Sequence, residues 1–179
     1  GTMNTTPQPA IERITPFAGN PLVVGIEPGQ PDIVVVTAAR LAETLKAKVY
    51  FAYADPQRIT EREFPDGTVQ HGGLDPDFSG DEIWQARRDQ LVAAVHKTLG
   101  EAPIEWEFRY LAGRADRALT HLARAVDASM IVIGTRRPGS SGRVKRLLQG
   151  TLGRHLAHHQ HRPVLMIPTS VVDWKIPLE

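Results

Sequence analysis

The stretch Met130-Ile131-Val132-Ile133-Gly134 decides the fold class of this chain. Its first four residues are apolar without interruption, which is typical of a central strand buried on both faces of a parallel sheet. A segment of helical periodicity opens at Gly113, just ahead of this stretch. Its inward-facing apolar residues are Ala115, Leu119, Leu122 and Val126. A helix that leads into a buried strand predicts an α/β domain.

Working outward, the rest of the chain repeats this alternation of strand and helix. Four more short apolar runs predict strands, at residues 22–26, 49–54, 104–110 and 164–167. Helical patterns fill residues 31–45, 81–99 and 144–155. Polar and apolar residues alternate strictly from Ile104 to Tyr110, so that strand is expected at a sheet edge. The sequence therefore predicts a single three-layer α/β domain with a five-stranded parallel sheet and helices on both faces.

Three segments fall outside this pattern. Residues 1–20 have no periodicity and predict a flexible N-terminal arm, in which Gly1-Thr2 ahead of Met3 is interpreted as a cloning remnant. Residues 55–80 predict a surface insertion, either a lid over the strand ends or a decoration of one sheet edge. The domain is expected to span residues 21–168, and residues 169–179 form a C-terminal tail.

Composition excludes several classes of protein. The 179 residues are 41% hydrophobic and 23% charged, which is ordinary for a globular domain. The absence of cysteine excludes a disulfide framework, thiolate metal sites and a cysteine nucleophile. The longest charge-free apolar stretch, residues 14–26, is interrupted by prolines and is too short to span a bilayer. With no secretion signal recognised, a cytoplasmic location is expected.

The charge is unevenly distributed along the chain. The formal net charge is only +1, which gives no general attraction to nucleic acid. Residues 128–172, however, contain no acidic side chain and seven of the 21 basic ones. Such a basic third suits a phosphate-bearing ligand or an acidic partner protein. A solvated basic helix face remains the alternative.

The loop that opens at Gly134 has the composition of a phosphate cradle. Glycines between a buried strand and a helix expose backbone N–H groups near the positive end of the helix. A P-loop is rejected, because Ser140 stands where that motif needs lysine. A glycine loop without a ligand is the other interpretation. Gly150, inside a helical stretch, costs about 1 kcal/mol relative to alanine, which indicates a close approach by a ligand or a second helix.

Candidates for metal binding and catalysis are weaker. Four histidines gather near one helix end, where an exposed helix terminus is favoured over a metal site: His155, His158, His159 and His161. Residues 75–81 resemble the start of a calcium loop, but the twelfth position is Ala86 instead of glutamate. No motif of a nucleophilic or metal-dependent hydrolase is present, so no catalytic or metal-binding residues are assigned.

Four segments together resemble the universal stress protein family over residues 20–168. They are LVVGIEPG (22–29), AKVYFAYADP (47–56), AGRADRALTHLARAVDASMIVIGTR (112–136) and GRVKRLLQGTLGRHLAHHQHRPVLMIP (142–168). The resemblance implies the adenine nucleotide alpha hydrolase-like fold, which is the five-stranded parallel α/β domain expected above. It also implies a stress-response regulator, usually a homodimer that pairs through its last strand, here Val164 to Ile167.

Some family members bind ATP, and the resemblance implies a site for ATP or another adenine nucleotide, with or without Mg²⁺. Glu27 stands where ATP-binding members carry aspartate, and Tyr53 corresponds only by its location at the end of the second strand. The loop is longer than the family pattern. The residues implied around the phosphates are Gly134, Gly139, Ser140, Gly142, Gly150 and Thr151, with Arg136 and Arg143 neutralising phosphate charge.

Two rival functions remain open at this point. One is a non-nucleotide-binding dimeric scaffold of the same fold, which engages a partner protein through its basic C-terminal third. The other is an ATP-hydrolysing enzyme, for which the motifs supply no general base, so that at most weak hydrolysis is expected.

Overall fold

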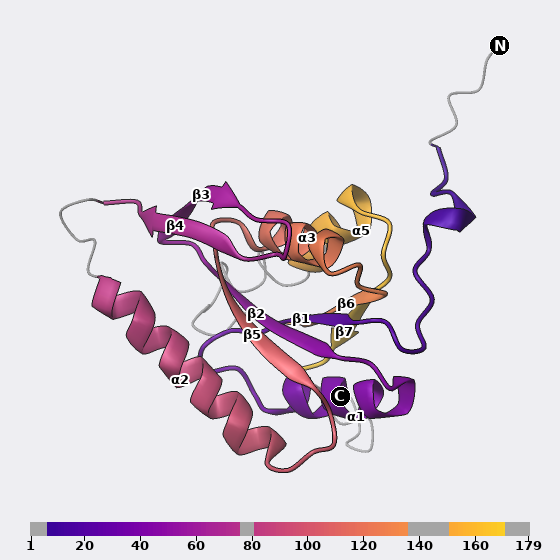
Figure 1. Ribbon diagram of the computed structural model, residues 1–179, viewed down its shortest axis with the longest axis horizontal. Helices are drawn as coiled ribbons and strands as arrows, with labels where there is room; N and C mark the ends of the chain where they lie inside the picture. Colours follow the sequence, from indigo (N-terminus) through magenta and orange to yellow (C-terminus); the bar gives the residue numbers. More distant parts are fainter. Residues whose placement is uncertain (1–6, 76–80, 136–150, 171–179) are drawn as a thin grey trace, which may run out of the picture.

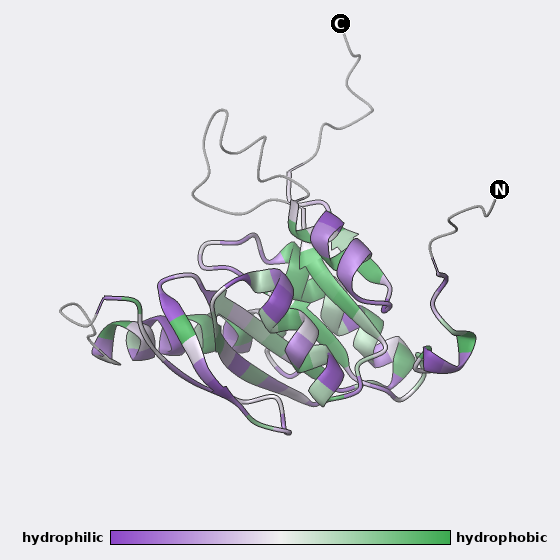
Figure 2. Cartoon of the chain, turned by 90° about the horizontal axis from the view of Figure 1, so that it is seen from above, coloured by the Kyte–Doolittle hydropathy of each residue, from purple (hydrophilic) through white to green (hydrophobic). Residues whose placement is uncertain are grey.

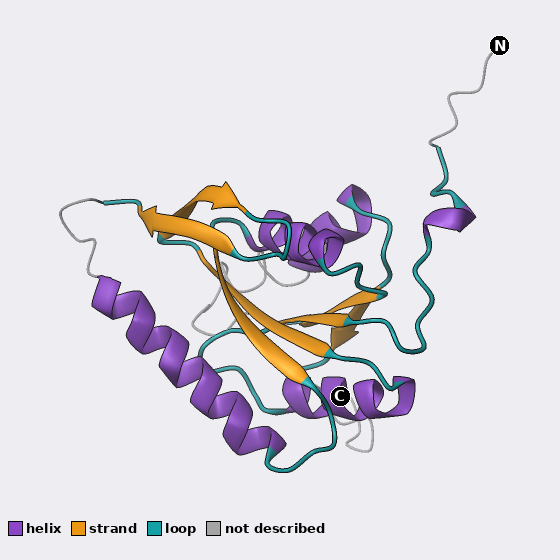
Figure 3. Cartoon of the chain, viewed as in Figure 1, coloured by secondary structure: helices purple, strands orange, loops and turns teal. Residues whose placement is uncertain are grey.

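The computed structural model describes residues 7–75, 81–135 and 151–170. Strands and helices alternate through most of this range, as Figure 3 shows. In chain order the elements are η1 (Ile11–Arg13), β1 (Leu22–Gly25), α1 (Ile33–Leu45), β2 (Val49–Asp55), β3 (Arg58–Glu63), β4 (Val69–Gly73), α2 (Asp81–Leu99), β5 (Trp106–Ala112), α3 (Ala115–Ala125), β6 (Met130–Gly134), α5 (Thr151–His159) and β7 (Val164–Ile167).

The main sheet has five strands in the order β5-β2-β1-β6-β7, and every neighbouring pair is parallel. Helices α1 and α2 cover one face, and α3 and α5 cover the other (Figure 1). This arrangement confirms the predicted three-layer α/β fold. It also confirms the predicted edge strand, because β5 ends the sheet, although this strand spans Trp106–Ala112 and not residues 104–110.

The core consists of two apolar layers, because side chains of a strand alternate between the faces of its sheet. On β1, Val24 points into the layer beneath α1 and α2, whereas Val23 points into the layer beneath α3 and α5. Both side chains are fully buried, as are Ile131 and Val132 on β6. Figure 2 shows hydrophobic strands beneath helices whose visible faces are largely hydrophilic. The uninterrupted apolar runs of these central strands follow from burial on both faces.

Residues 58–73 form a β-hairpin that the sequence analysis missed. Strands β3 and β4 pair antiparallel as a separate two-stranded sheet, with a register shift between Thr60 and Arg62. Both strands lack a clear apolar alternation, since β3 is mostly charged and β4 ends in two glycines. The hairpin lies on the same side of the main sheet as α3 and α5 (Figure 1).

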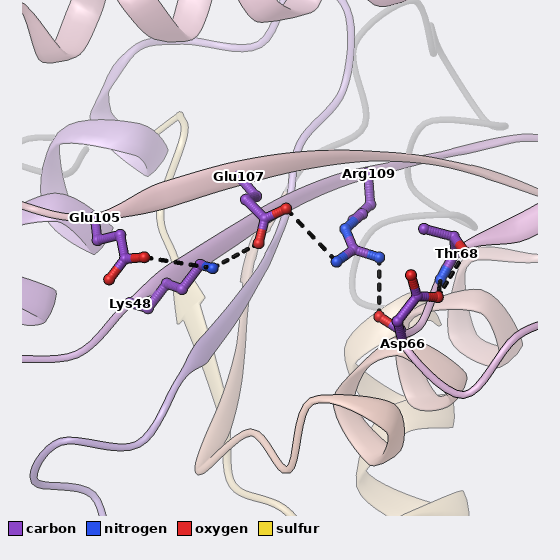
Figure 4. A network of polar contacts seen from close by, with 6 residues as sticks. All are labelled: Lys48, Asp66, Thr68, Glu105, Glu107 and Arg109. Atoms are coloured by element: carbon purple, nitrogen blue, oxygen red, sulfur yellow. Dashed lines mark hydrogen bonds and ion pairs between the residues drawn. The ribbon is translucent and has the colours of Figure 1, made fainter.

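The hairpin is attached at both of its ends. At its base, the His71 ring of β4 packs against the Trp84 ring of α2, with 4.6 Å between the ring centroids, and Nδ1 of His71 accepts a 2.6 Å hydrogen bond from Arg58 Nε of β3. At its tip, Gly67 packs so closely on α3 that a Cβ there would lie 2.6 Å from Leu122 Cδ1. Arg109 of β5 donates to the backbone oxygen of Asp66 at 2.9 Å (Figure 4). The hairpin therefore covers part of the sheet next to the β5 edge.

Smaller differences from the predicted boundaries also occur. Helix α1 begins at Ile33, two residues after the expected Pro31, within the usual uncertainty of helix ends. Of the last predicted helix, only α5 from Thr151 onward falls among the described residues. Within the described ranges, no helix combines the length and apolarity needed to cross a membrane.

Candidate functional site

Two adjoining cavities open at the carboxyl ends of the parallel strands, where ligands of open α/β sheets bind. The inner cavity lies between the ends of β1, β2 and β6 and has a volume of about 20 Å³. The outer cavity, of about 630 Å³, lies between the hairpin and the first turns of α3 and α5. Ala115 and Leu152 line both cavities, so the two cavities adjoin at these residues. The outer volume falls in the range of small-molecule sites, whereas the inner one admits roughly one water molecule.

Glu27 and Gly134 lie together at the inner cavity. Glu27 follows β1 and Gly134 is the last residue of β6, and the carboxyl ends of these neighbouring parallel strands reach the same edge of the sheet. A Cβ at Gly134 would lie 2.7 Å from Gln30 Nε2 and 3.0 Å from Thr169 Cγ2, so a side chain there would require the Gln30 side chain to move. Glycine at this position therefore lets Gln30, in the turn after β1, lie close to the end of β6.

The outer cavity is lined by charged and polar side chains of α3 and α5. Arg114 donates two hydrogen bonds to the Asp116 carboxylate, from Nε to Oδ1 at 3.1 Å and from Nη2 to Oδ2 at 2.9 Å. His155 Nδ1 lies 3.9 Å from Asp116 Oδ2, so α3 and α5 approach each other through this pair. Thr151 lies one helical turn before His155 and lines the same cavity.

The hairpin forms the remaining wall of the outer cavity. The Thr60 hydroxyl of β3 donates to the backbone oxygen of Ala112, at the end of β5, at 3.3 Å. Ile59 and Leu74 add apolar surface and are about half exposed. Because the hairpin is attached at its base and tip, it gives the cavity a fixed wall.

A family model for the universal stress proteins matches residues 20–168. This chain belongs to the universal stress protein family. The family membership confirms the resemblance inferred from the four sequence segments.

Individual universal stress proteins agree with this assignment. The stress response protein NhaX of Bacillus subtilis is 26% identical over 148 residues, which cover 74% of this chain and 87% of that protein. A universal stress protein solved in complex with cAMP is 23% identical with a TM-score of 0.56, and the match covers 86% of this chain and 99% of that one. Another, from Archaeoglobus fulgidus in complex with dAMP, is 20% identical with a TM-score of 0.55 and covers 82% and 96%. At these identities, the two structures show a shared fold.

Of the site residues that the family pattern implied, the structure places three at the cavities. Glu27 and Gly134 line the inner cavity, and Thr151 lines the outer one. The others fall outside the described residues: Arg136, Gly139, Ser140, Gly142, Arg143 and Gly150.

Tyr53 is not brought to these cavities. Its side chain is 6% exposed and packs on the α1 and α2 side of the sheet, where its ring lies 5.5 Å from that of Tyr110, centroid to centroid. Its neighbours Ala52 and Ala54 point to the opposite face and line the inner cavity instead. Residues of a strand alternate between faces, so strand position alone did not indicate which residue of β2 lines the cavity.

The sequence analysis missed several residues of the outer cavity. Arg114, Asp116 and Arg117 follow the end of β5, which had been recognised only as a strand end. A charged cluster immediately after a predicted strand was the available signal. His155 was noted only within the histidine cluster, and among the described residues no group of three or more histidine, aspartate or glutamate side chains is arranged to hold a metal ion.

Proposed function

We propose that this universal stress protein binds an adenine nucleotide, with ATP as the first candidate, in the outer cavity and beside the inner one. The observation that carries the proposal is that an outer cavity of about 630 Å³, lined by Thr151, adjoins the inner cavity lined by Glu27 and Gly134. The nucleoside would face Glu27, and the phosphates would approach Thr151 at the start of α5, where backbone N–H groups favour anions. Relatives of the same fold have been solved with cAMP and dAMP, which supports an adenine nucleotide.

The glycine-rich segment remains part of this proposal. We infer that its backbone and the arginines Arg136 and Arg143 contact the phosphates, with Mg²⁺ as an optional partner, and that the bound protein acts as a regulator in the stress response. A cysteine-free sequence agrees with a reducing compartment, so we infer a cytoplasmic location.

A second candidate function rests on the last strand. β7 ends the main sheet, and its Leu165 and Met166 are each 38% exposed. An apolar edge strand offers unpaired backbone groups to another chain. We infer that two copies of the chain pair through Val164–Ile167. The rival function is that of a dimeric scaffold, which binds no nucleotide and docks an acidic protein on its basic C-terminal third.

The first experiment is to ask whether the purified protein carries a nucleotide. The protein is denatured and removed, and the supernatant is separated by anion exchange with detection at 260 nm. If the protein is purified empty, ATP is titrated by calorimetry with and without Mg²⁺. We expect the parent protein to bind ATP, and the Thr151→Val and Glu27→Gln variants to bind it more weakly.

Thr44→Val is the matched control. Thr44 lies on the exposed side of α1, where its hydroxyl bonds only to the backbone oxygen of Arg40 among the described residues, and it lines neither cavity. This variant should bind as the parent protein does. No bound nucleotide, together with no heat on adding ATP, would reject nucleotide binding and favour the dimeric scaffold.

A further inference from the structure

We propose that His155 is a proton-linked phosphate contact: in its protonated form it strengthens the binding of the nucleotide phosphates, so that affinity depends on pH. This inference rests on the proposed nucleotide binding and adds a regulatory property to the same site. It gives a role to one member of the histidine cluster that the nucleotide pattern of the family did not use.

The position of His155 brings its ring to the phosphate end of the cavity. His155 and Thr151 are four residues apart on α5 and therefore share one face of that helix. Both line the outer cavity. A phosphate that reaches the Thr151 hydroxyl is thus within one helical turn of the imidazole. The His155 side chain is 41% exposed, so it exchanges protons with solvent.

Asp116 is the acidic group next to His155. Its side chain is only 10% exposed, and its Oδ2 lies 3.9 Å from His155 Nδ1. The guanidinium of Arg114 forms two hydrogen bonds to the same carboxylate. The Asp116 carboxylate is therefore already paired with Arg114.

The other charged groups around the cavity come from the hairpin and from both helices. Arg117 of α3 and Glu63 of β3 line it, and Arg58 of β3 lines it with its guanidinium already bonded to His71. With Arg114 and Asp116, these groups leave a net charge of one positive unit, and protonation of His155 doubles it.

The same helix carries further histidines. The His159 ring lies 6.1 Å from that of His155, centroid to centroid, but does not line this cavity. A nucleotide polyphosphate carries several negative charges, so a second positive unit at this position changes affinity directly.

The test compares the affinity for ATP, without metal, of the parent protein and His155→Gln at pH 8 and pH 6. Each comparison is made at one pH, so the titration of ATP itself cancels. At pH 8 the two proteins should bind within about two-fold of each other. At pH 6 the parent should bind ATP roughly ten-fold more tightly than His155→Gln does, which is the size of one charge-assisted hydrogen bond.

His158→Gln is the matched control, since His158 is exposed on the same helix and lines neither cavity. It should follow the parent protein at both pH values. Calorimetry at pH 7 in two buffers of different ionisation enthalpy adds a second readout: the parent should take up protons on binding ATP, and His155→Gln should take up fewer. His155→Asn repeats the comparison if the glutamine variant unfolds.

Two outcomes would overturn the inference, and they are distinguishable. If the parent binds ATP but the ratio between parent and His155→Gln is the same at pH 6 and pH 8, His155 is no proton-linked contact while nucleotide binding stands. If the parent binds no ATP at either pH, the proposed function fails together with the inference.

Discussion

The two edges of the main sheet are built in opposite ways. The β5 edge is seven residues long and has the hairpin beside it, whereas the β7 edge is only four residues long (Figure 1). Next to the β5 edge, charged side chains connect the sheet to the hairpin. On β7, Leu165 and Met166 expose apolar surface. Because an open edge strand can pair with another chain, charge and coverage protect one edge, and the other is the one suited to a partner.

The protected edge depends on a row of polar contacts (Figure 4). Lys48, just before β2, lies 3.6 Å from Glu105 and 2.5 Å from Glu107. Arg109 lies 3.7 Å from Glu107 and bonds to the hairpin tip at Asp66. Glu107 and Arg109 share one face of β5, and Arg109 connects this row of contacts to the hairpin.

The largest expected effect breaks the proposed interface at β7. Leu165→Glu would place one carboxylate from each copy of the chain near the other across a β7–β7 contact. Like charges in such close contact cost several kcal/mol. The dimer should dissociate with a dissociation constant raised by roughly 100-fold or more. Analytical ultracentrifugation over a concentration series measures this change.

Ile83→Glu is the control for this variant. It makes the same substitution at a residue that is 61% exposed on α2, away from β7. It should leave the oligomeric state unchanged. A parent protein that sediments as a monomer at all concentrations, or a Leu165→Glu variant that remains dimeric, would contradict pairing through β7.

The next effect tests how tightly the hairpin tip is seated. Gly67 and Gly19 both have positive φ angles, +88° and +78°, but only Gly67 has a close neighbour, Leu122. Alanine in this conformation costs about 1 kcal/mol at either position. Gly67→Ala should cost about 2 kcal/mol more, because its Cβ overlaps Leu122 and the tip must shift. Urea unfolding of both variants measures the difference, and equal costs would show that the tip is loosely packed.

How far the sequence predicts this fold depends on where each element finds its partners. The strand from Met130 to Gly134 and the helix before it have periodicities set by burial, so local pattern was sufficient. The hairpin is different, because its stability comes from distant contacts such as Gly67 on Leu122. Charged residues at its strand positions gave no local signal that such contacts exist.

The candidate site shows the same division. Glu27 and Gly134 were predictable as neighbours, because both follow parallel strands that end at one edge of the sheet. To place Tyr53, one must know which face of the sheet each side chain of β2 points to, and the position along the strand alone does not give this. The approach of His155 to Asp116 depends on how α3 and α5 pack together, and no pattern in either helix specifies that distance.

A third prediction concerns the buried carboxylate beneath the covered edge. The Tyr110 hydroxyl of β5 donates a 2.6 Å hydrogen bond to Asp55 Oδ2, and Asp55 is only 2% exposed. Tyr110→Phe removes this donor and should cost about 1–3 kcal/mol of unfolding free energy. A double-mutant cycle with Asp55→Asn isolates the interaction. An interaction energy near zero would show that Arg87, 3.5 Å away, and the Gln57 N–H, at 2.9 Å, satisfy the carboxylate without Tyr110.

The same bond predicts a pH effect. Burial, reinforced by the hydrogen bond to Asp55, raises the pKa of Tyr110 well above its ordinary value. A raised pKa means that the folded state favours the neutral phenol, so this contribution to stability is present at neutral pH and is lost as the pH rises beyond about 10. In an absorbance titration, the Tyr110→Phe variant should lose a tyrosine that ionises late.

The smallest effect belongs to the charged row on the β5 edge. The hydrogen bond from Lys48 lowers the pKa of Glu107 and raises that of Lys48. Because the pKa of Glu107 is lowered, its contribution to stability is present above the ordinary pKa range of glutamate and is lost as the pH falls through that range. Because the pKa of Lys48 is raised, its contribution is lost only at high pH. Because Glu107 is 45% exposed, solvent screens the pair. Glu107→Gln should therefore cost only about 0.5 kcal/mol near neutral pH, and less in 1 M salt.

Glu105→Gln provides the comparison on the same strand edge. Glu105 is 77% exposed and lies farther from Lys48, at 3.6 Å, so its loss should change the unfolding free energy by less than that of Glu107. Urea unfolding at pH 3 and pH 7 measures the free energy of unfolding of both variants. The difference between Glu107→Gln and Glu105→Gln should be smaller at pH 3 than at pH 7. If the two variants cost the same at pH 7, the row protects the edge only by carrying charge, and the specific pairing of Lys48 with Glu107 adds nothing to stability.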